Sequence, residues 1–264
     1  MNKALFKREI KANWMIWVIF IAVISLYKSM VIAIYDPQTN ELMDKFAEMM
    51  PELMAAVGMI NGGSTLLDFI ASYLYGMLLL IFPLLLEIIL SNRLVSRYID
   101  RGSMAYLLST PVSRLKIVTT QASILLLSLV FMMGFMIGFG TLCSQIIFPG
   151  ELNVAKYALL NVEWLFLQFA ICGICFLASA VCNDSKHAYM FGAGIPIAFY
   201  IIKMIANLGK DFEAFRYFTI YTLFDTNKII SGESTLWQCI TLITIGIVCF
   251  AIAIVRFVKR DLSL

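Results

Sequence analysis

The sequence predicts an all-α integral membrane protein with six transmembrane helices, and three observations lead to this fold class. Of the 264 residues, 61% are hydrophobic and 14% are charged, and the mean hydropathy is +0.87. Soluble domains contain about 45–50% apolar and about 25% charged residues, and disordered chains are poorer still in apolar residues. The apolar residues gather in long stretches, and these stretches lack the alternating pattern of β-barrel strands.

Six apolar stretches are long enough to cross a hydrocarbon layer, which takes about 20 helical residues. They cover residues 14–35, 69–90, 122–148, 158–182, 188–206 and 236–255. The third is the longest, and we expect it to tilt or to project beyond the bilayer. No large soluble block interrupts the stretches, so residues 1–264 are interpreted as a single transmembrane domain.

The basic residues predict the orientation of this domain. Six spans place both termini on one side of the membrane, and thirteen of the twenty Lys and Arg residues lie on that side. Five lie in the opposite loops, and Lys28 and Lys203 fall inside spans. Because loops rich in Lys and Arg stay in the cytoplasm, we expect a multi-pass protein of the cell (inner, cytoplasmic) membrane with both termini in the cytoplasm.

The sequence carries no recognisable catalytic or metal-binding site. Its one histidine, His187, is too isolated for a catalytic triad or a metal cluster. The phosphate-binding motif G-x-x-x-x-G-K-[S/T] does not occur, so we do not expect the chain to hydrolyse ATP in that manner by itself. Cys172 and Cys175 have the spacing of a redox or metal pair, but their apolar surroundings favour small buried cysteines. A net charge of +3 is too small to indicate a nucleic-acid partner.

Three ionisable side chains lie inside spans, where a charge costs about 2.5–3.5 kcal/mol on insertion scales. Lys28 and Lys203 are near the outer ends of their spans, and we expect both to extend to the interface. Glu87 follows Pro83 by four residues, and the proline removes a backbone hydrogen bond and favours a kink. Two interpretations of Glu87 remain open: a structural partner at the interface or, together with Pro83, a role in gating or substrate passage.

The inner loop between the second and third spans, residues 93–121, is the most informative part of the sequence. It is basic and contains a short helical stretch, 103–109, which is expected to end before Pro111. Ser113 can then cap the helix of the third span. A protein without a large soluble domain has little reason to shape an inner loop in this way unless a partner docks there. The alternative is an ordinary basic turn.

At this loop the sequence resembles the type-2 exporter permeases of ATP-binding-cassette (ABC) transporters. Residues 102–114, GSMAYLLSTPVSR, align without a gap with the family signature, which runs close to E-R-E-x-G-T-L-E-L-L-L-A-T-P-V-S-R. The glutamate four residues before the glycine is Tyr98 here, and the acid three residues after it is Ala105. Residues 222–232 and the ending at 257–262 are also similar to the family, so the resemblance covers essentially the whole chain.

The resemblance implies that the inner loop forms a cytoplasmic coupling helix in a groove of a separate ATPase subunit. It also implies that the N-terminal segment is an interfacial elbow helix. The residues that would couple to the ATPase are Asp100, Arg101, Gly102, Ser103, Leu107, Leu108, Ser109, Thr110, Pro111, Val112, Ser113 and Arg114. The short second inner loop, 183–188, would make a lesser contact through Asp184, Lys186 and His187.

The resemblance further implies an assembly and an activity. Two ATPase subunits and a second permease, identical or homologous, would complete the transporter in the lipid bilayer. ATP and Mg would be bound by the partner ATPase and no cofactor by this chain, which would be the permease subunit of an ATP-driven exporter rather than an enzyme. Its Met, Phe and Leu content without deep charges favours an apolar or amphipathic substrate, such as a peptide, a drug or a lipid-like molecule. The alternatives are an ATP-independent channel or secondary carrier, and a membrane immunity or sensor protein.

Overall fold

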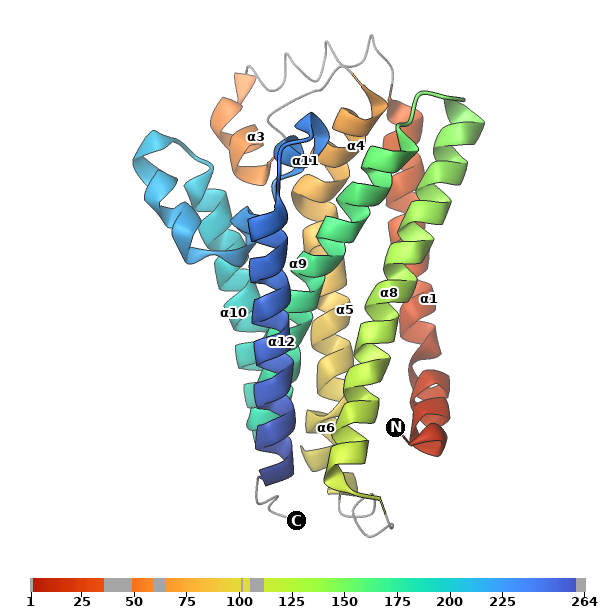
Figure 1. Ribbon diagram of the computed structural model, residues 1–264, viewed down its shortest axis with the longest axis vertical. Helices are drawn as coiled ribbons and strands as arrows, with labels where there is room; N and C mark the ends of the chain where they lie inside the picture. Colours follow the sequence, from red (N-terminus) through yellow and green to blue (C-terminus); the bar gives the residue numbers. More distant parts are fainter. Residues whose placement is uncertain (1, 36–48, 59–64, 101, 105–111, 260–264) are drawn as a thin grey trace.

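The computed structural model describes residues 2–35, 49–58, 65–100, 102–104 and 112–259. All regular secondary structure within these ranges is helical, and six helical segments are long and apolar enough to cross a membrane. The predicted all-α membrane fold is therefore confirmed. The long helices run roughly side by side along the longest dimension of the molecule (Figure 1).

The first span, α1 (Lys3–Ile34), is one uninterrupted helix. Asn2 caps it, because the side-chain Oδ1 accepts hydrogen bonds from the amides of Ala4 (3.0 Å) and Leu5 (3.3 Å). No glycine or proline interrupts the sequence of α1, so nothing in it breaks the helix. The segment expected to be a separate elbow helix is thus the beginning of α1 in this structure.

The second span is composed of four consecutive pieces, and each of the remaining spans is one helix. The pieces are α4 (Leu66–Tyr73), the π-helical turn η1 (Leu74–Leu78), α5 (Leu79–Leu94) and α6 (Ser96–Asp100). The other spans are α8 (Arg114–Ile147), α9 (Val154–Val181), α10 (Ser185–Ala206) and α12 (Leu236–Lys259). All six predicted spans correspond to these helices, although α8 begins before residue 122. It does so because Ser113 caps it as predicted, with its Oγ accepting from the amide of Lys116 (3.4 Å).

Pro83 lies inside α5 and changes how the second span packs. Because proline has no amide hydrogen, the carbonyl of Leu79 loses its helical partner. Two side chains of α9 donate to this carbonyl instead, Trp164 through Nε1 (2.7 Å) and Gln168 through Nε2 (3.1 Å). The interruption of α5 therefore fastens it to α9.

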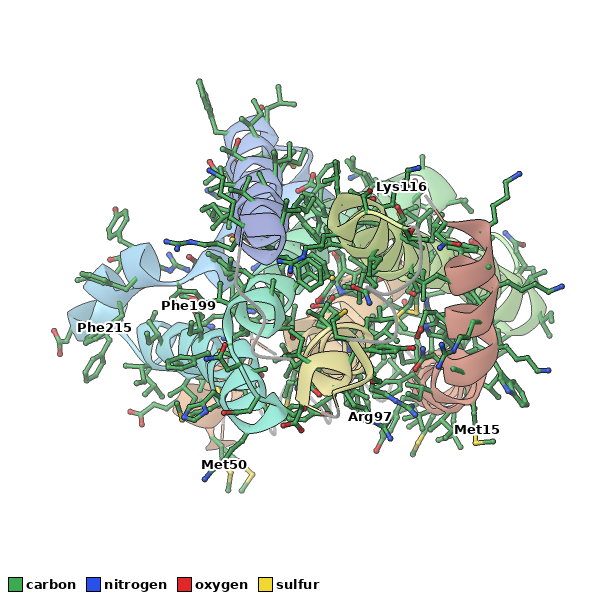
Figure 2. The ribbon with its side chains drawn as sticks, turned by 90° about the horizontal axis from the view of Figure 1, so that it is seen from below. Met15, Met50, Arg97, Lys116, Phe199 and Phe215 are labelled. Carbon is green, nitrogen blue, oxygen red and sulfur yellow. The ribbon has the colours of Figure 1, made fainter. Side chains whose placement is uncertain are left out.

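Helix α9 is the central helix of the bundle and packs against α5, α8, α10 and α12. Its side chains Trp164, Leu167 and Ile171 are fully buried in the core. Glycines bring α9 and α12 close together, since a Cβ atom on Gly173 would lie 3.2 Å from the carbonyl oxygen of Gly246. Helices α1 and α8 pair on one flank of the molecule, and α10 lies on the opposite flank (Figures 1 and 2).

Both chain termini lie at the same end of the bundle, which we call the terminus end (Figure 1). Short helices gather at the opposite end, which we call the far end. They are α3 (Pro51–Val57), the 3₁₀ segments η2 (Lys210–Phe218) and η3 (Ile220–Leu223), and α11 (Thr226–Ser231). Helix α3 ends at Gly58, whose φ of 82° suits glycine, and this residue packs against Gly76 of the π-helical turn.

Candidate functional site

The predicted ATPase-coupling segment lies at the terminus end, between α6 and α8 (Figure 1). Six of its residues fall within the described ranges: Asp100, Gly102, Ser103, Val112, Ser113 and Arg114. The other six lie outside the described residues: Arg101, Leu107, Leu108, Ser109, Thr110 and Pro111. The coupling role of all twelve stays a prediction.

The chain leaves α6 in a defined conformation where this segment begins. Gly102 has a φ of 65°, which suits glycine, and its amide donates to the carbonyl of Ile99 (3.0 Å). Ser103 Oγ donates to the carbonyl of Tyr98 (3.2 Å), and the next side chain, Met104, is fully buried. The first residues of the segment are therefore held against the bundle.

Two hydrogen bonds connect the second span to the region of the second loop. Ser96 Oγ donates to the carbonyl of Ser179 near the end of α9 (3.0 Å). Asn92 Nδ2 donates to the carbonyl of Ser185 at the start of α10 (3.2 Å). Because Ser185 directly follows Asp184, the stretch 92–96, which leads into the predicted coupling segment, lies next to the second predicted docking loop.

The second loop enters α10 through Asp184, which is the N-cap of that helix. The carboxylate accepts a hydrogen bond from the backbone amide of His187 (2.7 Å) and lies 2.7 Å from Nδ1 of the same residue. The backbone hydrogen bond, followed by the contact with the ring, holds the pKa of the Asp184 carboxyl below its ordinary value. Lys186 and His187 are exposed, so the loop presents polar side chains to the surroundings.

Glu87 lies in α5, one turn after Pro83, and is 2% exposed. Its two carboxyl oxygens have no hydrogen-bond partner among the described residues, and neither does the hydroxyl of Ser91 one turn further on. Cys172 and Cys175 of α9 and Tyr221 of η3 are near its carboxyl group. An unpaired buried polar group costs about 1–3 kcal/mol. Within the part of the chain that the structure describes, Glu87 thus lacks the hydrogen-bonding partner that a structural role would supply.

The prediction that Lys28 extends to the interface is wrong. The side chain is fully buried, and its Nζ donates to the carbonyl of Met136 in α8 (2.6 Å), 5.0 Å from the centre of the Tyr157 ring. Gly140 provides the space, because a Cβ atom there would overlap the Tyr157 hydroxyl and lie 2.7 Å from Lys28 Cε. The lysine therefore reaches a backbone carbonyl of a neighbouring helix instead of water.

Lys28 belongs to a chain of buried hydrogen bonds that joins four helical segments. The Tyr157 hydroxyl donates to the same Met136 carbonyl (2.8 Å), and Asn161 Nδ2 donates to the carbonyl of Tyr157 (2.7 Å). The hydroxyl of Tyr75 in the π-helical turn donates to Asn161 Oδ1 (2.8 Å). We call these five residues the Lys28 network. This network was not predicted from the sequence, although Asn161, a polar residue within the fourth apolar stretch, is a signal for it.

A cavity of about 690 Å³ opens at the far end, between the π-helical turn, α10, α12 and the η2–α11 connection. Its lining includes Lys203, which is partly exposed, and the buried residues Tyr75 and Gly76 of the π-helical turn. Such π-helical turns occur frequently at functional sites. The cavity therefore adjoins both the Lys28 network and the far-end surface.

Comparison with known proteins adds an independent observation. The sequence profile of a family described as "ABC-2 family transporter protein" matches residues 5–262. The chain belongs to the ABC-2 transporter family. This permease is accordingly a multi-pass membrane component of a transporter, of a type that generally lacks an ATPase site of its own. Comparisons with curated proteins and with solved structures found no match.

Proposed function

We propose that this permease is the transmembrane subunit of an ATP-driven exporter, with a separate ATPase subunit docking on its terminus end. The observation that carries the proposal is the hydrogen bond from Asn92 to the carbonyl of Ser185. It holds the end of α5, which leads through α6 into the coupling segment, beside the start of α10 and the second loop, and this supports a common docking surface at the terminus end. Two ATPase subunits, which bind ATP and Mg, and a second permease, identical or homologous, would complete the assembly.

The orientation follows from the distribution of basic residues. Most of the Lys and Arg residues of the sequence lie on the side of the chain termini, and membrane proteins keep loops rich in these residues in the cytoplasm. The proposed docking surface therefore faces the compartment that contains ATP, and export runs from the terminus end toward the far end. The membrane in question is the cell membrane, with both chain termini in the cytoplasm.

The proposed docking surface is connected to the core by helices rather than by loops. A displacement of the coupling segment acts on α6, where Ser96 is bonded to the end of α9, and then on α5. Further along α5 lie Glu87 and Pro83, and Pro83 is the point where the helical hydrogen bonding is interrupted. We propose that Glu87 and Pro83 take part in gating. The support is that the described contacts leave both carboxyl oxygens of Glu87 unpaired.

The substrate class that fits the proposal is apolar or amphipathic, such as a peptide, a drug or a lipid-like molecule. The far-end cavity supports this, because aromatic side chains such as Phe199 and Phe224 line it together with Lys203 and Asp225. Mixed aromatic and charged linings suit ligands that carry both apolar and polar groups.

The proposal is tested by co-expression with candidate ABC ATPases, beginning with any encoded by a neighbouring reading frame. The permease should co-purify with one of them and change its rate of ATP hydrolysis in proteoliposomes. A scrambled sequence at 103–109 should abolish both effects. A scrambled sequence of equal length at 211–217, in the exposed η2 segment of the far end, is the control for docking and should leave co-purification unchanged.

Three results would contradict the proposal. Substrate flux driven by an ion gradient in ATP-free vesicles would indicate a channel or secondary carrier. Stable binding to a partner without any substrate flux would indicate an immunity or sensor protein. Retention of ATPase coupling by the 103–109 scramble would remove the coupling segment from the account.

A further inference from the structure

A second cavity, of about 340 Å³, lies at the terminus end between the beginning of α1 and the junction of α5 with α6. Three arginines line it, Arg8 from α1 and Arg93 and Arg97 from the second span. Arg97 lies on the side of the second span that faces α1 when the bundle is viewed from the terminus end (Figure 2). Arg93 and Arg97 are partly buried, and the Arg8 guanidinium lies 5.9 Å from the centre of the Tyr98 ring. We call this cavity the arginine pocket.

One carboxylate, that of Glu9, lies in the arginine pocket, and its oxygens already accept hydrogen bonds from two neutral side chains. Glu9 is 2% exposed; the Tyr98 hydroxyl donates to its Oε1, and Asn13 Nδ2 donates to its Oε2 (3.3 Å). Among the described residues the ion pairs are Asp184 with His187 and Glu213 with Arg216, so the three pocket arginines form none. Three positive charges thus face one bound carboxylate, and the pocket retains a positive charge that an anion would neutralise.

The position of the pocket indicates which kind of anion fits. Asn13 is followed by Trp14, which is 52% exposed and begins the apolar part of α1, and by the exposed Met15. Exposed tryptophan at the start of an apolar span is typical of the level of the lipid headgroups. Lys7 and Lys11 are also exposed on this part of α1. The arginine pocket therefore lies where phosphate groups of lipids occur and hydrocarbon begins.

We propose that the arginine pocket binds the phosphate group of an anionic phospholipid from the adjoining membrane leaflet. Guanidinium groups bind phosphate oxygens in a planar, two-pronged geometry, and basic pockets between transmembrane helices bind acidic headgroups. The acyl chains then extend along the exposed apolar side chains that follow Trp14 on α1. The inference is independent of the ATPase partner, and the proposed function enters only in naming the leaflet as the cytoplasmic one.

Binding there would connect two parts of the chain that act together in the proposed function. Arg8 lies on the first span. Arg97 precedes by three residues Asp100, where the coupling segment begins, and Ser103 of that segment lines the pocket. A bound phosphate bridges these elements through charge-assisted hydrogen bonds. An anionic lipid should therefore stabilise the junction of α1 with α6.

The test is native mass spectrometry of the delipidated, purified permease titrated with phosphatidylglycerol or phosphatidylcholine of identical acyl chains. We expect the wild type to retain phosphatidylglycerol about tenfold more strongly, because only the anionic headgroup leaves the pocket neutralised. The double variant Arg93→Gln/Arg97→Gln should lose this preference. The control Lys116→Gln/Arg256→Gln removes two exposed charges from the terminus end outside the pocket and should keep it.

A soluble arm of the titration, with glycerol 3-phosphate and with inorganic phosphate, distinguishes a lipid from a free anion. If either compound displaces phosphatidylglycerol when present at the concentration at which phosphatidylglycerol saturates the pocket, the pocket is a site for a soluble phosphate compound, and the proposal of a lipid ligand is overturned. Equal retention of the two lipids by the wild type, or an unchanged preference in the double variant, would overturn the site. Should the double variant fail to fold, Arg8→Gln provides the same test, because that side chain is exposed and its loss should reduce the preference.

Discussion

Lys28 and Glu87 are both ionisable side chains buried in the apolar bundle, yet their surroundings differ completely. Lys28 is bonded to a backbone carbonyl at 2.6 Å, lies over the Tyr157 ring and belongs to a hydrogen-bonded network. Glu87 has two carboxyl oxygens and no hydrogen-bond donor for either among the described residues. The burial of Lys28 is explained by the fold of one chain, whereas that of Glu87 is not. This difference separates a structural group from a group that we assign to gating.

The largest effect on stability is expected at Gly140, because the Lys28 network occupies the space that a side chain at this position would fill. Gly140→Ala should lower the free energy of unfolding by about 1–3 kcal/mol, because the added methyl group overlaps the Tyr157 hydroxyl and displaces Lys28. Thermal unfolding of the detergent-solubilised permease measures the change. Gly134→Ala in the same helix is the control, since a Cβ atom there meets nothing within 4 Å. Equal stability of the two variants would contradict a stabilising role of the Lys28 network.

A smaller effect is expected from removing one hydroxyl of that network. Tyr75→Phe loses the hydrogen bond to Asn161 and should cost about 1 kcal/mol. Tyr221→Phe is matched to it, because the Tyr221 side chain is equally buried but its hydroxyl has no partner in the described part of the chain. We expect Tyr221→Phe to be neutral or slightly stabilising in the same unfolding assay. A larger loss of unfolding free energy for Tyr221→Phe than for Tyr75→Phe would show that the Tyr221 hydroxyl has a hydrogen-bond partner.

A variant of Glu87 should separate an effect on export from an effect on stability. Glu87→Gln keeps the size of the side chain and, since no bond is lost, should change the free energy of unfolding by about 0.5 kcal/mol or less. It should nevertheless reduce ATP-dependent export by about tenfold, which corresponds to roughly 1.4 kcal/mol in an activation barrier. Transport in proteoliposomes gives this readout.

Glu163 is the matched control for Glu87. It is also a buried glutamate, but its Oε1 accepts a hydrogen bond from Thr235 (2.6 Å). Glu163→Gln should therefore affect stability more than Glu87→Gln and export less. The reverse pattern would assign Glu87 to structure and remove it from the proposed gate.

The smallest effect concerns an exposed group, Asp184. Since contacts with His187 lower the pKa of Asp184 in the folded state, its capping contribution is present above the unfolded-state pKa and is lost as the pH falls through the folded-state pKa. The protection of the first amides of α10 against hydrogen exchange, measured relative to the intrinsic exchange rate at each pH, should therefore fall at acidic pH. Asp184→Ser keeps a neutral cap and should remove this acid dependence, whereas an unchanged dependence would exclude Asp184 as its source.

The features predicted correctly from the sequence depend on residues that are neighbours along the chain. Six spans follow from local hydropathy, and the cap of α8 follows from Ser113 placed shortly after a proline. The position of Lys28 could not be predicted in this way, because it depends on Gly140 in another helix. The arginine pocket has the same character, since Glu9 and Tyr98 are 89 residues apart in sequence. Tyr98 occupies the position of a glutamate in the family signature, and only the fold shows that it bonds to a glutamate instead.

We propose above that an ATPase subunit docks on the terminus end of this permease. A photo-crosslinking amino acid at Lys186, an exposed residue of the second loop, tests it directly, with Tyr217 as the matched exposed position at the far end. After irradiation of cells that contain the assembled transporter, adducts are analysed by mass spectrometry. We predict an adduct with an ABC ATPase from position 186 and none from position 217. An ATPase adduct from position 217, or its absence from position 186 in an active transporter, would contradict the account.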